Sequence, residues 1–193
     1  MSSSTQSILL AGVGGQGILR ASDILSLALM EAGFDAKKSE VHGMAQRGGC
    51  VTSHVRYGTK VYSPIAKKRD INILLSFEIM ETLRYLDYLK PGGRVILNVA
   101  EIYPPAVNLG EARYPSDVIA MVKNHVNNVK IVNASELADK AGNSRTANIV
   151  LLGALSSLVT EINADCWERV LRSSFPKKVV KANLAAFELG RNP

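Results

Sequence analysis

The sequence is poor in cysteine, in aromatic residues and in long apolar runs, and each shortage excludes a class of protein. Its 193 residues include two cysteines, Cys50 and Cys166, fewer than an iron–sulfur cluster normally needs as ligands. The longest apolar stretch, Ile149–Val159, is shorter than the ~18 residues of a membrane span and is interrupted by Gly153. Aromatic residues make up 6% of the chain and are not interleaved with basic ones, as they are in many nucleic-acid-binding proteins. We therefore expect no metal site in this chain and neither nucleic acid nor membrane as a partner.

The overall composition is that of a folded protein with a mild excess of positive charge. Hydrophobic residues make up 47% and charged residues 21%, close to the averages for globular domains. The net charge of +6 is a mild preference for anions, although solvated surface lysines explain it equally well. The segment Met1–Gln6 has no basic residue before the first apolar run, so a secretory signal is not expected. We expect one cytoplasmic α/β domain over residues 1–193.

Apolar strands alternate with helices along most of the chain. Strands are predicted at 7–12, 71–76, 94–99 and 129–132, and helices at 18–32, 77–90, 116–125, 135–137, 146–159, 165–173 and 176–189. Gly33 and Gly190 are predicted to end helices, Pro91–Gly93 to form a turn, and 103–115 to form a loop. The alternating segment 50–57 followed by 60–63 predicts an inserted β-hairpin. This pattern indicates a Rossmann-like parallel sheet with helices on both faces, a hairpin insertion and a helical C-terminus.

A glycine-rich loop follows the first predicted strand and opens the first helix. It reads Gly12-Val-Gly14-Gly15-Gln16-Gly17, a G-x-G-x-x-G spacing in the context that phosphate binding requires. Glycine lets the backbone approach a phosphate, and the helix N-terminus offers unpaired N–H groups. A dinucleotide site also expects an acidic residue about 20 positions later at the end of an apolar strand. Asp35 and Glu40 bracket that position in a segment unlike such a strand, so a close-packing turn or a subunit contact remains an alternative.

A second polar segment lies among glycines at residues 39–49. It contains Glu40, His42, Gln46 and Arg47, and polar loops of this kind carry function more often than they merely connect elements. The Arg47 guanidinium suits an anion, and the His42 imidazole suits proton transfer. No nucleophile arrangement surrounds His42, and we interpret Cys50 as a small strand residue. Presentation to another protein explains this mixture at least as well as a complete active site.

These two segments together resemble the small subunit of the 2-oxoacid:ferredoxin oxidoreductases, and most closely that of the indolepyruvate branch. The residues that carry the resemblance are the glycine loop, the run Glu40-Val-His-Gly-Met-Ala-Gln-Arg-Gly-Gly49, Ser63-Pro64, Phe77-Glu78, Arg84 and the segment 183–190. The resemblance therefore covers nearly the whole chain. Cys50 departs from the serine expected there, which puts little in doubt.

The resemblance implies a subunit of a larger oxidoreductase that binds no cofactor by itself. Such enzymes decarboxylate a 2-oxoacid oxidatively to an acyl-coenzyme A and pass the electrons to ferredoxin. A large alpha subunit would carry thiamine diphosphate, Mg²⁺ and the 4Fe-4S clusters. In this chain Glu40, His42, Gln46 and Arg47 would support the active site without a covalent role. His42, Met44, Arg47, Gly48 and Gly49 would form the interface, and Gly12, Gly14, Gly15, Gln16 and Gly17 would contact the phosphates of coenzyme A.

Two alternative functions remain open at this point. A pyruvate or 2-oxoglutarate enzyme of the same family would use the same kind of subunit. A free-standing NAD(P)-binding protein would rest on the glycine loop alone.

Overall fold

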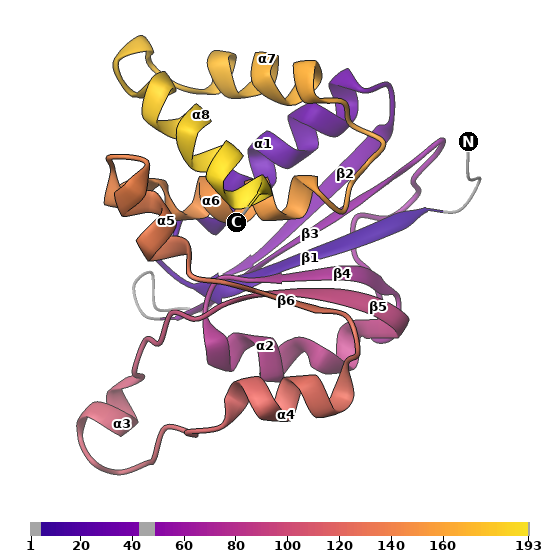
Figure 1. Cartoon of the computed structure of the whole chain (residues 1–193). Coiled ribbons are helices and arrows are strands. Elements are labelled where there is room, and N and C mark those ends of the chain that lie inside the picture. The colour runs from indigo at the N-terminus through magenta and orange to yellow at the C-terminus, as the bar shows by residue number, and fades with distance from the viewer. Residues whose placement is uncertain (1–4, 43–48, 193) are drawn as a thin grey trace.

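The computed structural model describes residues 5–42 and 49–192, with the backbone alone at His42. In this part of the chain six strands form one sheet in the order β2-β3-β1-β4-β5-β6 (Figure 1). The strands are β1 (Gln6–Val13), β2 (Asp35–His42), β3 (Cys50–Gly58), β4 (Ile71–Ser76), β5 (Leu89–Asn98) and β6 (Val129–Val132). β1, β4, β5 and β6 are parallel to their neighbours in that group, whereas β3 pairs antiparallel with both β1 and β2.

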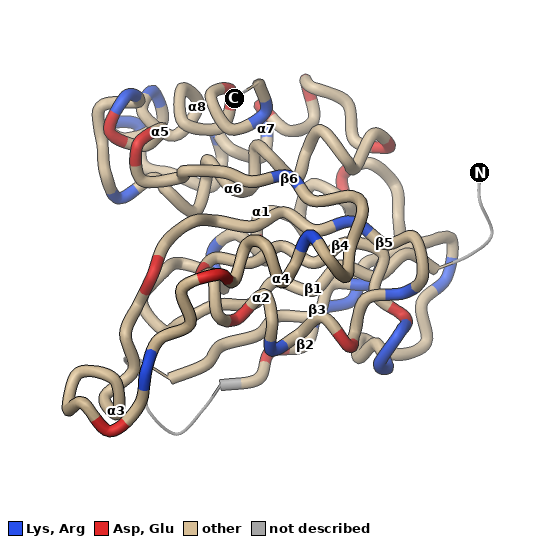
Figure 2. Tube along the Cα trace, turned by 60° about the horizontal axis from the view of Figure 1, so that its bottom comes forward, with Lys and Arg blue, Asp and Glu red and all other residues tan. Residues whose placement is uncertain are grey.

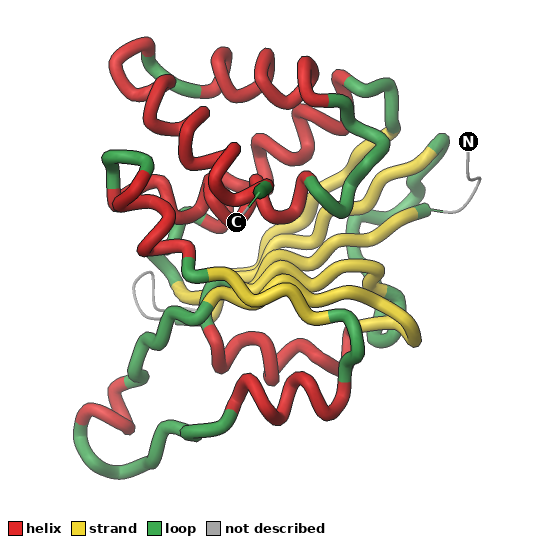
Figure 3. Tube along the Cα trace, viewed as in Figure 1, coloured by secondary structure: helices red, strands yellow, loops and turns green. Residues whose placement is uncertain are grey.

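Helices cover both faces of the sheet (Figure 3). One face carries α1 (Ile18–Glu31), α5 (Ala134–Lys140), α6 (Ala147–Ser156), α7 (Ala164–Ser174) and α8 (Lys177–Arg191), and the other carries α2 (Ile79–Tyr85) and α4 (Val118–His125). The single turn α3 (Pro105–Asn108) lies in an excursion away from the sheet, and 3-10 turns span Leu86–Tyr88 and Ser144–Thr146. The predicted fold class is confirmed.

The two helical layers enclose two apolar clusters because strand side chains alternate between the faces. In β1, Ile8 and Leu10 pack toward α1 and α6, whereas Leu9 and Ala11 pack toward α2 and α4. The helix predicted at 146–159 is α6, and its residues Ile149–Ser156 are all buried. A helix that is apolar on every side therefore lies in the middle of the larger layer.

The hairpin insertion is present, and its strand predicted at 50–57 is β3, but its second strand is not the one predicted. The partner of β3 is β2, a polar segment, and residues 60–63 form no strand. The backbone after β3 is held by side chains instead: the Asp35 carboxylate accepts from Val61 N at 2.8 Å, and Arg56 donates to the carbonyl of Ser63. An edge strand is less covered than a central one and can be polar, so β2 lacks the apolar pattern that predicts a strand.

Three other boundaries differ from the sequence prediction. The helix expected at 77–90 ends at Tyr85, and β5 begins at Leu89, so that Pro91–Gly93 lies in an irregular stretch of β5 with Gly92 at φ +74°. The loop predicted at 103–115 contains α3. Gly190 lies inside α8 and does not end it, whereas Gly33 follows α1 at φ +89° as predicted.

A buried histidine on β3 should make the fold sensitive to acid. His54 is 7% exposed, its Nδ1 accepts from Ala66 N, and its ring meets that of Tyr88. Burial, followed by the charge of Arg56, lowers the pKa of His54 below its ordinary value. The unfolded chain therefore binds the proton more readily, and stability should fall as the pH drops through about 6.5.

A thermal-unfolding series between about pH 8 and pH 5 tests this expectation. His54→Gln keeps an acceptor but cannot titrate, so its unfolding temperature should fall less toward acid than that of the wild type. His125→Gln, on the exposed end of α4, is the matched control and should keep the wild-type dependence. An unchanged pH dependence in His54→Gln would contradict the assignment.

Candidate functional site

The glycine loop links β1 to α1 as the sequence predicted. Gln16 N donates to Val13 O at 3.2 Å and closes the turn, and α1 begins at Ile18 with Gly17 as its N-cap. Gly15 and Gly17 have φ values of +104° and +77°, in the region that residues other than glycine rarely adopt. No side chain caps the helix, so its first-turn N–H groups face the loop. Uncapped helix starts of this kind bind anions in many proteins.

Gln16 has a structural role within the loop. Its Oε1 accepts from Val13 N at 2.8 Å, and its Nε2 donates to the carbonyl oxygen of Phe77 at 2.7 Å, just after β4. A methyl group on Gly12 would lie 2.7 Å from Gln16 Oε1 and equally close to Phe77 Cβ. Gly12 therefore permits close packing, and Gln16 locks the loop to the neighbouring strand. Among the loop residues, Gly15 is the exposed one.

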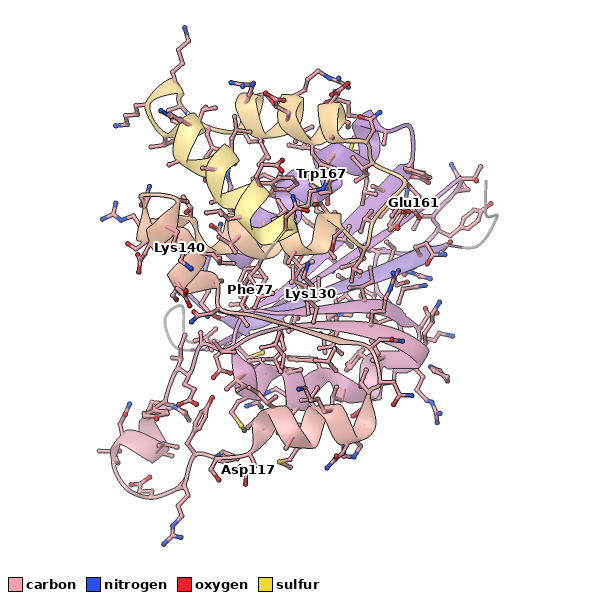
Figure 4. All side chains as sticks on the ribbon, in the orientation of Figure 1. Phe77, Asp117, Lys130, Lys140, Glu161 and Trp167 are labelled. Carbon is pink, nitrogen blue, oxygen red and sulfur yellow. The ribbon has the colours of Figure 1, made fainter. Side chains whose placement is uncertain are left out.

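The loop stands where helices leave adjacent parallel strands toward opposite faces. β1 leads into α1 on one face, and β4 leads into α2 on the other (Figure 1). Ligands of parallel α/β sheets gather at such a point. Phe77 marks it in Figure 4. The Asn98 side chain, at the end of β5, donates to Phe77 O at 2.8 Å and accepts from Ala134 N at 3.1 Å, which fixes the carboxyl edge of the sheet.

The structure brings the two predicted motifs together at this edge. Gly14 N donates to Gly49 O at 2.9 Å, and Val13 pairs with Cys50 in the β1–β3 ladder. β2 ends at the same place with His42, opposite Val51. Of the predicted site residues, Met44, Gln46, Arg47 and Gly48 lie outside the described residues, and at His42 the backbone alone is described. Glu40 lies in β2 and accepts from Lys38 Nζ.

A cavity of about 440 Å³ adjoins the end of β1. Its wall is formed by the start of β3, by α2 and by the excursion 102–115. The buried carboxylate of Glu78 holds this excursion, because its oxygens accept from Glu81 N, Ile102 N and the Tyr114 hydroxyl. No local sequence pattern indicates this arrangement, because Glu78 and Tyr114 lie 36 positions apart.

Cys50 lines this cavity but is a poor nucleophile. Its Sγ lies 2.9 Å from the Tyr85 hydroxyl. Burial raises the pKa of the Cys50 thiol to about 11, so little thiolate exists at neutral pH. The interpretation of Cys50 as a strand residue is consistent with its place at the start of β3.

Asp35 does not lie where a dinucleotide site needs its acidic residue. That acid normally ends a parallel strand next to β1. Here β3 is the neighbour of β1 on that side and runs antiparallel, and Asp35 begins β2 one strand farther out. Asp35 instead accepts from Val61 N and Lys37 Nζ. The geometry gives no support to a free-standing NAD(P) protein.

Comparison with known proteins gives a consistent match over nearly the whole chain. The family described as pyruvate ferredoxin/flavodoxin oxidoreductase matches residues 7–192. The indolepyruvate oxidoreductase subunit IorB of Pyrococcus horikoshii is 42% identical over 187 residues, covering 95% of this chain and 93% of that protein.

None of the helices in the described part of the chain is long and apolar enough to cross a membrane.

Two solved structures share the fold. The gamma subunit of a keto/oxoacid ferredoxin oxidoreductase from Geobacter sulfurreducens matches 96% of this chain and 95% of its own with a TM-score of 0.71 at 24% identity. The 2-oxoglutarate:ferredoxin oxidoreductase from Magnetococcus marinus, solved with 2-oxoglutarate, coenzyme A and succinyl-CoA, matches 97% of this chain with a TM-score of 0.75 at 24% identity. This chain spans 30% of that longer protein.

Proposed function

This chain belongs to the pyruvate ferredoxin/flavodoxin oxidoreductase family, and we propose that it is the small subunit of an indolepyruvate:ferredoxin oxidoreductase. The observation that carries the proposal is the 42% identity to an indolepyruvate oxidoreductase subunit along almost the full length of both chains. The enzyme oxidatively decarboxylates an arylpyruvate to an acyl-coenzyme A, with ferredoxin as the electron acceptor.

The redox cofactors of this enzyme belong to a partner. With two cysteines, this chain cannot supply the ligands of iron–sulfur clusters by itself. A large alpha subunit carries the clusters, thiamine diphosphate and Mg²⁺, and the thiamine supplies the chemistry of decarboxylation. This chain is inactive alone.

Two parts of this chain complete the partner's active site. The segment from His42 to Gly49 docks on the large subunit and excludes water from the reacting centre, with His42, Gln46 and Arg47 as the polar contacts. The glycine loop binds the phosphates of coenzyme A at the start of α1. The uncapped helix and the exposed Gly15 fit a phosphate, and the hydrogen bond from Gly14 to Gly49 O places the loop beside the docking segment.

An anaerobic pull-down with the tagged full chain tests the assignment. The eluate should contain a large partner with iron–sulfur absorbance and should reduce a viologen dye with indolepyruvate and coenzyme A. We expect kcat/KM for indolepyruvate to exceed that for pyruvate or 2-oxoglutarate about tenfold or more. A reversed preference would favour the other branches of the family, and a colourless eluate without a partner would contradict the subunit assignment.

The same complex tests the docking segment. Arg47→Ala should lower turnover about tenfold or more while the complex still forms, because the charge of Arg47 orders the covered site. Arg172→Ala, on the exposed side of α7 where Arg172 pairs with Glu168, is the matched control. Equal turnover of both variants would remove this role.

A further inference from the structure

The outer edge of β2 is open in the part of the chain that the structure describes. β2 is the last strand of the sheet, and its inner side pairs with β3 in continuous register from Asp35 opposite Gly58 to His42 opposite Val51. No described strand continues the sheet beyond it. An edge of this length offers a row of backbone N–H and C=O groups to another strand.

The two faces of β2 carry different side chains. Lys38 and Glu40 lie on the face covered by α1, because Lys38 Nζ reaches both the Glu40 carboxylate and Asp23 of α1. Lys37, Ser39 and Val41 alternate with them and lie on the other face. Charges of both signs therefore occur along a single edge strand (Figure 2).

Two-fold symmetry restricts how this edge can pair with itself. An antiparallel pair related by an axis through the sheet keeps each face on its own side, so a residue on the axis faces its own copy. With Lys38 on the axis, two like charges are opposed, which is unfavourable. With Ser39 on the axis, Lys38 faces Glu40 of the second copy twice, and four charges alternate in sign around the axis.

We propose that a second copy of this chain pairs antiparallel with β2, with Ser39 on the two-fold axis. In this register Lys37 faces Val41, whose side chain is 56% exposed, and the lysine stem covers it. The sheet continues across the two copies. The proposal goes beyond the function inferred above, because it joins two small subunits without the large one.

Exposed apolar residues beside this edge support a protein partner there. Leu27 and Met30 of α1 are 49% and 58% exposed, and they lie on the same helix face as Asp23, four and seven residues along. Since Asp23 bonds Lys38, this face of α1 borders the open edge. Burying apolar side chains adds to the strand pairing.

Sedimentation equilibrium of the full chain, with two opposite charge changes, tests the proposal. The wild type should form a dimer, and Lys38→Glu and Glu40→Lys should each weaken it about tenfold or more by opposing like charges. An equimolar mixture of the two variants should dimerise as the wild type does, because position 38 of one then faces the opposite charge at position 40 of the other in both places.

The control is Lys130→Glu, the same charge change on β6 at the other edge of the sheet, where Figure 4 labels Lys130. It should dimerise like the wild type. A monomeric wild type, or a dimer indifferent to both changes, would overturn the proposal. Failure of the mixture to restore the dimer would also overturn it, because both changes would then have damaged the strand itself.

Discussion

Gly190→Ala should destabilise the fold by about 3 kcal/mol, although alanine ordinarily favours a helix over glycine by about 1 kcal/mol. Gly190 lies inside α8, where that helix crosses α6. A methyl carbon there would lie 2.6 Å from the carbonyl carbon of Val150 and closer still to its oxygen. The neighbour is backbone, so no rotamer change relieves the overlap, and the two helices must separate.

Gly153 on α6 faces the same crossing, because a methyl carbon there would lie 2.9 Å from the carbonyl carbon of Phe187. α6 is buried along its length, so a shift of either helix disturbs the core of that layer. Gly153→Ala should therefore show a comparable loss, and the effects of the two changes should not add because they widen one contact.

Thermal unfolding measures this directly. We expect the midpoint of Gly190→Ala to fall by about 6–12 °C for a protein of this size. Ala185→Ser adds one atom on the exposed side of the same helix and should change the midpoint by less than about 2 °C. A Gly190→Ala midpoint at or above the wild type would show that the helices do not approach so closely.

The role of Gly190 illustrates what local sequence patterns omit. Near the end of an amphipathic segment, a glycine indicates the end of a helix. Gly190 instead allows the close approach of α6, whose Val150 lies 40 positions earlier in the sequence. Segments with strong local patterns were predicted well: β4 and β6 have the predicted bounds, and α6 is buried as its uniformly apolar sequence indicated.

β2 was missed as a strand for a related reason. Its sequence is polar, and pairing with β3 on one side suffices to hold it, so the hydrophobic signal is weak. Residues 60–63 lie close to β3 in sequence, and this proximity favoured them as its partner. The actual partner is β2, which pairs with β3 from Asp35 opposite Gly58 to His42 opposite Val51, and periodicity does not reveal this pairing.

The glycine loop was predictable because its geometry is set within six residues and one strand–helix junction. The surrounding site was not, because the side chains of Gln16 and Asn98 both donate to the carbonyl oxygen of Phe77, which lies 61 and 21 positions away from them. These contacts show that the residues of the loop have different roles, which the glycine motif alone does not distinguish. Gly12 and Gln16 maintain packing, and Gly15 is left exposed beside the helix start.

Gly15→Asp should raise the KM for coenzyme A about tenfold above that of Gly15→Asn in the assembled enzyme. A Cβ atom added at this position, two residues before the N-cap Gly17 of α1, would meet no described atom within 4 Å. Both substitutions share the strain of φ +104°, and asparagine and aspartate tolerate positive φ better than most residues. They differ in charge, and a carboxylate there repels a phosphate that is bound by the same helix start.

Steady-state kinetics at varied coenzyme A separates binding from turnover. The kcat at saturating coenzyme A should differ between the two variants by less than about threefold, and the difference in KM should shrink with added salt, since exposed charges are screened. Both variants are assayed in the assembled enzyme with indolepyruvate as substrate. The comparison therefore tests the role of the glycine loop and does not depend on a difference in subunit assembly. Equal KM values for the two variants would place the phosphates of coenzyme A elsewhere and leave the glycine loop with its packing role alone.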